Sequence, residues 1–124
     1  MKLESRTYAD TVVVSPTGRL DHDNCEAFRA GLQPLLVQAL ASRQRIVLDL
    51  SHLQYVSSAG LRCFMLAAKQ TGTQGSKIVL AELRPVVAEI FQISRFDMVF
   101  EIYPSVREAL ATLSPAAASA FDQG

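Results

Sequence analysis

Three small residues, Ser57, Ser58 and Gly60, begin an apolar helical segment directly after a buried strand and a short crossing. The first turn of a helix leaves backbone N–H groups without intrahelical partners, and the helix dipole favours negative charge there. A serine hydroxyl at this position can therefore carry a phosphate that its own chain tolerates and that a docked partner detects. The pattern predicts a switchable binding surface rather than an active site.

The same residues also admit purely structural interpretations. Serine is among the best helix N-caps, so Ser58 could cap its own helix, and one of the two serines can cap while the other is exposed. Glycine inside a helix costs about 1 kcal/mol relative to alanine. Gly60 therefore indicates close packing of the helix on the sheet, which we favour, or close approach of a partner's backbone or a phosphate.

An enzymatic role for these serines is disfavoured. Ser58 lacks the Gly-x-Ser-x-Gly elbow of serine hydrolases, and no acid–histidine pair can be assigned to it. His22 and His52 are expected in surface loops, where a single histidine without a partner is a poor general base. The sequence also has no glycine-rich loop of the Walker type. We therefore expect a binding protein rather than an enzyme.

The composition is typical of a single globular domain with balanced charge. The chain has 124 residues, 49% of them hydrophobic, with 12 Lys and Arg against 12 Asp and Glu. Balanced charge without a basic cluster argues against nucleic acid as a partner. The longest apolar run is too short to cross a bilayer, and the N-terminus has no apolar stretch like a signal peptide. We expect a cytoplasmic protein that does not insert into membranes.

The two cysteines, Cys25 and Cys63, lie far apart in the sequence and belong to no Cys-x-x-Cys pair. A disulfide is possible in principle, but a single bridge would be unusual support for a domain with this large a core. Cys63 lies in an apolar helical segment and is expected to be a small buried hydrophobe. Clustered zinc ligands are absent from the sequence, so neither a metal nor another cofactor is expected.

Hydrophobic periodicity predicts five strands and about four helices in the order ββαβαβαβα. Apolar and β-branched runs predict strands at residues 3–8, 11–17, 45–50, 77–81 and 99–102. Helical spacing predicts helices after Asp23, from Ser57–Ser58 to Gly72 and Gly75, at 84–93 and at 105–113. This alternation is typical of an α/β fold with a mixed sheet and right-handed parallel crossovers. The apolar run at 45–50 indicates a central parallel strand covered on both faces, although the helices could gather on one side.

Local signals refine the helix ends. Asp23 followed by Glu26 resembles a capping box, and Pro34 should kink or split the first helix. Pro85 is expected in the first turn of its helix and Ser105 as an N-cap. Residues 114–124 are rich in Ala and Ser and are predicted to form a frayed or flexible tail, which leaves 1–113 as the folded domain.

Two motifs resemble those of a known family. The first is Gly18-Arg19-Leu20-Asp21 before the first helix, and the second is Asp49-Leu50-Ser51-x-Leu53-x-x-Val56-Ser57-Ser58-Ala59-Gly60-Leu61. Together with the order of the elements, they resemble a STAS domain, which is shared by bacterial anti-sigma factor antagonists and the cytoplasmic tails of sulphate transporters. The resemblance covers nearly the whole chain apart from the C-terminal tail.

The resemblance implies a phosphorylation switch. In the family, the first serine of an Asp-Ser-(Ser/Thr)-Gly motif is phosphorylated by a partner serine kinase that is itself the anti-sigma factor, and a phosphatase resets the switch. The matching acceptor here is Ser58. Ser57 stands where the family usually has Asp, and Ala59 where a second hydroxyl is common, which makes Ser57 an alternative acceptor.

The resemblance also implies a docking surface, formed by the N-terminal half of the Ser58 helix and the 18–24 loop beside it. The predicted partner-binding residues are Asp21, His22, Asp23, Ser57, Ser58, Ala59, Gly60, Leu61 and Arg62. The altered motif is compatible with a second hypothesis from the same family. In this alternative, the protein is a non-phosphorylated accessory subunit of a phospholipid-transporting ABC complex and binds the transporter ATPase.

Overall fold

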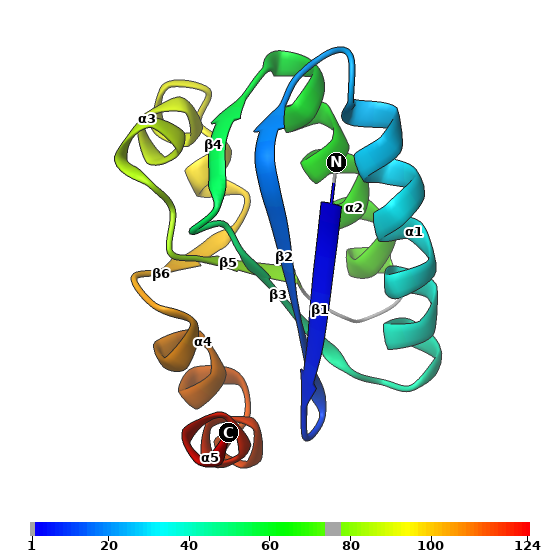
Figure 1. Ribbon diagram of the computed structural model, residues 1–124, viewed down its shortest axis with the longest axis vertical. Coiled ribbons are helices and arrows are strands. Elements are labelled where there is room, and N and C mark those ends of the chain that lie inside the picture. The colour runs from blue at the N-terminus through cyan, green and yellow to red at the C-terminus, as the bar shows by residue number, and fades with distance from the viewer. Residues whose placement is uncertain (1, 74–77) are drawn as a thin grey trace.

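The structure is a computed structural model that describes residues 2–73 and 78–124 (Figure 1). Its strands are β1 (Lys2–Tyr8), β2 (Thr11–Leu20), β3 (Arg45–Asp49), β4 (Leu53–Val56), β5 (Ile78–Ala81) and β6 (Glu101–Tyr103). Its helices are α1 (Cys25–Ala41), α2 (Ser58–Thr73), α3 (Pro85–Ile93), the 3-10 helix η1 (Phe96–Met98), α4 (Val106–Leu113) and α5 (Pro115–Gln123). These elements confirm the predicted α/β class with a mixed sheet.

The sheet has the strand order β1-β2-β3-β5-β6, and β4 pairs with β2 outside this path. β1 runs antiparallel to β2, and the other pairs are parallel. The first part of β2 pairs with β3 through Thr11–Val14, whereas its last residues, Gly18–Leu20, pair with β4. β2 therefore ends beside β4, directly before the start of α2.

Strand residues alternate between two cores on opposite faces of the sheet, as the two-residue period of a strand requires. Val14 and Leu48 pack into the larger core, which contains buried residues of α1, α2 and α3. Val13 and Val47 pack into the smaller core with buried residues of α4 and α5. Figure 1 shows α1 and α2 on one side of the sheet and α4 and α5 on the other. The helices thus cover both faces and do not gather on one side.

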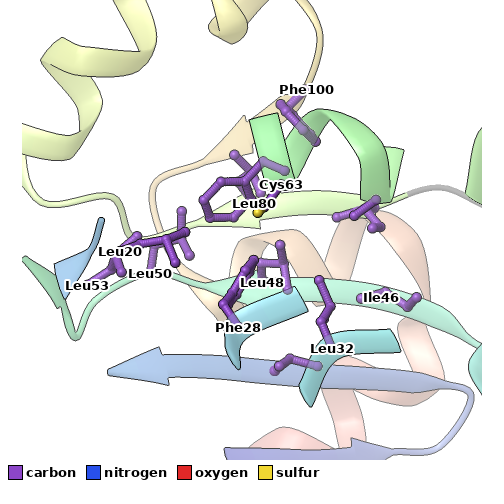
Figure 2. Close-up of a cluster of buried hydrophobic side chains, with 14 of the residues drawn as sticks. Leu20, Phe28, Leu32, Ile46, Leu48, Leu50, Leu53, Cys63, Leu80 and Phe100 are labelled. Carbon is purple, nitrogen blue, oxygen red and sulfur yellow. The ribbon is translucent and has the colours of Figure 1, made fainter. Parts of the chain in front are cut away.

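The larger core is built around aromatic side chains (Figure 2). Phe64 of α2 lies with its ring centroid 5.4 Å from that of Phe28 and 5.6 Å from that of Phe91. Cys63 belongs to the same cluster and is 8% exposed, as the sequence predicts. These contacts fix α2 against both α1 and α3, so the start of α2 has a defined position above the sheet.

The predicted element order is incomplete in the region before α2. Residues 53–56 form the short strand β4, and Gly18–Leu20 extend β2 where a loop is expected. The backbone N–H of Gly18 donates to the carbonyl of His52, and the N–H of Ser57 donates to that of Leu20. These long-range bonds stabilise segments that are too short and too polar to register as strands from their own periodicity.

The C-terminal residues do not form the expected flexible tail. They form α5, in which Ala117 and Ala118 are buried against the smaller core. The Ser114 side chain caps α5 by accepting a hydrogen bond from the N–H of Ala117. Small alanine side chains let α5 pack closely on the smaller core. The composition of residues 114–124 does not reveal this core, which is formed by other segments of the chain.

Other boundaries also differ from the predictions. α1 continues as one helix through Pro34. Pro34 has no N–H, so the carbonyl of Ala30 loses its usual donor. Both residues are exposed, and water can replace the missing hydrogen bond. The last strand begins at Glu101 because η1 and its cap occupy residues 96–99. α2 continues through Gly72 to Thr73. Gly75 is predicted to end this helix and Lys77 to begin the next strand, but both lie outside the described residues.

Two predicted helix starts are confirmed. Pro85 is the first residue of α3, where its missing N–H has no intrahelical role. The Ser105 side chain caps α4 by accepting from the N–H of Glu108. Within the described part of the chain, no helix combines the length and the apolar character needed to span a membrane.

Candidate functional site

The two serines at the start of α2 have different roles in the structure. The Ser57 hydroxyl accepts a hydrogen bond from the N–H of Gly60 at 3.2 Å, and the Ser57 carbonyl accepts from the N–H of Leu61 at 2.9 Å. Ser57 is therefore the N-cap, and Ser58 is the first residue of the helix. The Ser58 side chain is exposed, and its hydroxyl makes no hydrogen bond with any residue that the structure describes.

Gly60 permits α2 to begin close to the end of β2. A Cβ atom at Gly60 would lie 2.8 Å from the Cγ of Leu20 and 3.0 Å from the Leu20 carbonyl oxygen. Leu20 is fully buried, so its side chain has little room to move. The packing interpretation of Gly60 explains its position without a bound partner.

The loop before α1 is organised by its own side chains. Asp21 accepts hydrogen bonds through Oδ1 from the N–H groups of Asp23 and Asn24. Asn24 accepts from the N–H of Asp21 at 2.8 Å and donates to the carbonyl of Arg19. The predicted capping box is wrong, because Asn24 rather than Asp23 is the N-cap of α1 and makes no side-chain cap bond to the helix.

An open groove separates the first turns of α1 and α2. Its volume is about 530 Å³, and it is lined by His22, Cys25, Glu26, Arg29, Ser58, Ala59, Arg62, Cys63 and Leu66. Arg29, Cys63 and Leu66 also line a second hollow of about 250 Å³ farther along the two helices. Ser58 lines the first of these two hollows and does not line the second.

The comparison with family models decides the identity of the fold. The STAS domain model matches residues 2–109 of the 124-residue chain, from β1 through the first half of α4. The chain belongs to the STAS domain family. The family match covers the 18–24 loop, the Ser57–Ser58 motif and the groove between them, whereas α5 lies beyond its last residue.

Two of the similar proteins are described as anti-sigma factor antagonists. BtrV of Bordetella bronchiseptica, whose name proposes an anti-sigma factor antagonist, is 39% identical over 111 residues, covering 90% of this chain and 92% of BtrV. A crystal structure from Thermotoga maritima, described in the same terms, has a TM-score of 0.81 at 20% identity, covering 90% of this chain and 93% of that one.

The fold is also similar to that of a phosphorylated protein. The structure of the Bacillus cell fate determinant SpoIIAA in its phosphorylated form has a TM-score of 0.68 at 19% identity. The match covers 91% of this chain and 100% of the SpoIIAA chain. At these identities the two solved structures show a shared STAS fold, and the relation to BtrV is the stronger sequence similarity.

The STAS domain brings part of the predicted docking surface together. His22, Ser58, Ala59 and Arg62 line the same groove, although His22 precedes α1 and the others lie on α2. Asp21 and Asp23 lie outside that lining, Asp21 half-buried and Asp23 exposed. The other three predicted residues face inward to different degrees: Ser57 is half-buried, and Gly60 and Leu61 are buried.

Sequence reasoning missed the contribution of α1 to this groove. Arg29 follows Glu26 by three residues and Cys25 by four, which places it on the same face of a helix as each of them. Arg62 and Leu66 have the same spacing on α2. This periodicity was available as a signal, but only the packing of α1 on α2 shows that the two faces meet.

The groove of the STAS domain has a mixed charge. Arg29 and Glu26 form an exposed ion pair with an N–O distance of 3.7 Å, which is worth little in free energy because water screens it. Arg62 is exposed one helical turn after Ser58 and lines the groove with it. Nearby on the sheet, the Arg19 guanidinium lies 4.5 Å from the ring centroid of Tyr55. The groove lining thus holds two arginines, Arg29 and Arg62, and one acidic residue, Glu26, together with Ser58.

The geometry does not resemble a catalytic or metal site. Nucleophilic catalysis needs a base within hydrogen-bonding reach of the hydroxyl, and Ser58 has none among the residues of 2–73 and 78–124. In those same ranges, no three His, Cys, Asp or Glu side chains converge as a metal site would require. What the site offers is an accessible hydroxyl on a rigid helix start beside a groove.

Proposed function

We propose that this STAS domain is a non-catalytic anti-sigma factor antagonist that binds an anti-sigma factor with serine-kinase activity. Phosphorylation of Ser58 would release the partner, and a phosphatase would restore binding. The observation that carries the proposal is the exposed, unbonded Ser58 hydroxyl at the groove, with Ser57 acting as the cap. The name of BtrV, at 39% identity, supports the same class of partner.

The hydrogen bonding favours Ser58 over Ser57 as the phosphate acceptor. The Ser57 hydroxyl already accepts the N–H of Gly60, and its side chain is half-buried. Phosphorylating Ser57 would replace this cap and place a bulky dianion against the end of β2. Ser58 can accept a phosphate without breaking any of the described hydrogen bonds.

A phosphate on Ser58 would change the groove more than the fold. It adds about −1.5 to −2 charges at pH 7, beside a helix N-terminus that favours negative charge. Arg62 lies one turn along the same face and could pair with the phosphate. A partner seated in the groove would meet added charge and bulk. A change of about 1.4 kcal/mol already alters affinity tenfold.

Ser57 stands where the family usually has Asp, and this replacement keeps the helix cap. Both residue types cap helices, so the fold of the motif is retained. The acidic charge at this position is lost. We therefore expect a partner kinase whose substrate-binding site does not require an acidic residue before the acceptor serine. We expect the protein to act in the cytoplasm, where a sigma factor and its regulators meet.

The test is a pull-down from native lysate with four baits, read by mass spectrometry. The baits are wild type, Ser58→Ala, Ser58→Asp and Ser119→Asp, which adds the same charge at an exposed position of α5. Thermal unfolding of each bait verifies that it is folded. We expect an ATP-binding kinase of the anti-sigma type on every bait except Ser58→Asp.

Two results would overturn the switch. Equal retention of the kinase by Ser58→Asp and wild type would show that charge at this hydroxyl does not control docking. Recovery of a transporter ATPase on all four baits would support the accessory-subunit alternative instead. Incubation of the recovered kinase with ATP and each variant then identifies the acceptor, because wild type and Ser119→Asp should gain a phosphate whereas both Ser58 variants should not.

A further inference from the structure

The fold brings the two cysteines into contact across the α1–α2 boundary, although they are 38 residues apart in the sequence. The Sγ of Cys63 lies 3.6 Å from the carbonyl oxygen of Cys25, to which it donates. Both side chains line the groove that holds Ser58.

The two thiols differ in their access to solvent. Cys25 is half-buried at the first turn of α1, whereas Cys63 is 8% exposed and packs into the larger core (Figure 2). Burial, followed by the neighbouring Cys25, raises the pKa of the Cys63 thiol. A raised pKa keeps Cys63 protonated and slow to react with an oxidant from solvent. Cys25 is therefore the first thiol that such an oxidant reaches.

We propose that Cys25 and Cys63 are a dithiol pair that forms a reversible intramolecular disulfide between α1 and α2. Hydrogen peroxide oxidises the Cys25 thiol to a sulfenic acid and is itself reduced to water. The Cys63 sulfur then attacks the Cys25 sulfur, forming the S–S bond as the sulfenic oxygen leaves in a second water that carries the Cys63 proton. A dithiol reductant restores both thiols and is oxidised to its own disulfide.

The location gives the bond a regulatory consequence. Forming it draws the Cys25 sulfur from the groove wall onto Cys63 and fixes the first turn of α1 against α2. His22, whose carbonyl accepts from the Cys25 thiol at 3.5 Å, is coupled to this movement. The groove beside Ser58 therefore has an oxidised and a reduced form. Only the effect on partner binding rests on the proposed function, whereas formation of the bond does not.

The test uses the full chain, treated with hydrogen peroxide, quenched with catalase and alkylated under denaturing conditions. We expect wild type to lose two hydrogen atoms from its intact mass and to protect both cysteines from alkylation. Trypsin should release the peptides Leu20–Arg29 and Cys63–Lys69 as one disulfide-linked species. Treatment with dithiothreitol should separate them and restore two alkylation sites.

Single substitutions provide the controls. Cys25→Ser, at a half-buried helix start, should keep Cys63 alkylatable after peroxide treatment. Cys63→Ser should instead leave Cys25 to oxidise further, to a sulfinic acid, because no resolving thiol remains. If Cys63→Ser fails to fold, the linked tryptic peptide from wild type still decides the question.

The outcomes that overturn the proposal are equally defined. Wild type that accumulates Cys25 sulfinic acid with a free Cys63, or that forms only intermolecular dimers, does not contain a competent dithiol pair. Since the readout is a covalent mass, it is independent of kinase binding. Failure of the phosphorylation switch and failure of the disulfide are thus distinguishable.

Discussion

The Ser57 hydroxyl accepts the N–H of Gly60 at 3.2 Å and thereby leaves the neighbouring Ser58 hydroxyl exposed at the first position of α2. One serine holds the helix start in place and the other faces the groove. Gly60 contributes to both functions, because its N–H is the donor and its missing side chain lets the helix approach Leu20. The structural role thus belongs to Ser57, and the proposed regulatory role belongs to its neighbour Ser58.

The division predicts effects of different size on stability for the two alanine substitutions. Ser57→Ala removes the cap and should lower the free energy of unfolding by about 1 kcal/mol. Ser58→Ala removes no described hydrogen bond and should change it by less than about 0.5 kcal/mol. Urea denaturation of the two variants measures both values. Equal destabilisation would contradict the assignment of Ser57 as the cap.

Gly60→Ala should destabilise the fold despite the higher helix propensity of alanine. The propensity gain is about 1 kcal/mol, but overpacking against Leu20 and its carbonyl costs about 1–3 kcal/mol. Gly31→Ala is the matched control, since its new Cβ would meet only the end of the flexible Leu3 side chain. Thermal unfolding should show a lower melting temperature for Gly60→Ala than for Gly31→Ala. The reverse order would exclude tight packing as the reason for Gly60.

Adjacent alanines in α5 test whether the C-terminal helix belongs to the folded unit. Ala117 is fully buried and Ala116 is exposed. Ala117→Asp would bury a carboxylate without a partner and should cost several kcal/mol, on the order of 2–5. Ala116→Asp places the same charge in the first turn of α5, where the helix dipole tolerates it. If chemical denaturation gives the same stability for both, α5 does not pack as described.

Asp10 should make stability depend on acid pH. The Ser114 hydroxyl donates to its Oδ1 at 2.6 Å and lowers the Asp10 pKa below the ordinary value of 3.8. The folded state thus favours the carboxylate. Its stabilising contribution is present above pH 3.8 and is lost as the pH falls through the lowered folded-state pKa.

The variant Asp10→Asn isolates this contribution. The difference in unfolding free energy between wild type and Asp10→Asn should be constant near neutral pH and should shrink below about pH 4. Denaturation at a series of pH values measures it. Parallel curves for the two proteins down to the acid limit would show that the Ser114 hydrogen bond does not favour the charged form of Asp10.

Predictions from sequence succeeded where the signal was local. β-Branched and apolar runs identify β2, β3 and β5, and burial on both faces follows from continuous runs such as Ile46–Leu48. The helix start at Pro85 and the N-cap at Ser105 follow from residue type. Predictions from sequence failed for β4 and α5, because the stability of these elements comes from partners distant in the sequence.

The amino-acid sequence by itself determined the α/β class, the starts of α3 and α4 and the position of a paired-serine motif at the start of α2, because these depend on periodicity and nearest neighbours. Only the tertiary structure decided that Ser57 caps while Ser58 is exposed, and that α1 supplies a wall of the groove. It also placed Cys25 against Cys63. These relationships arise when helices pack on a shared sheet, and the chemistry of one segment does not specify which side chains of another will face it.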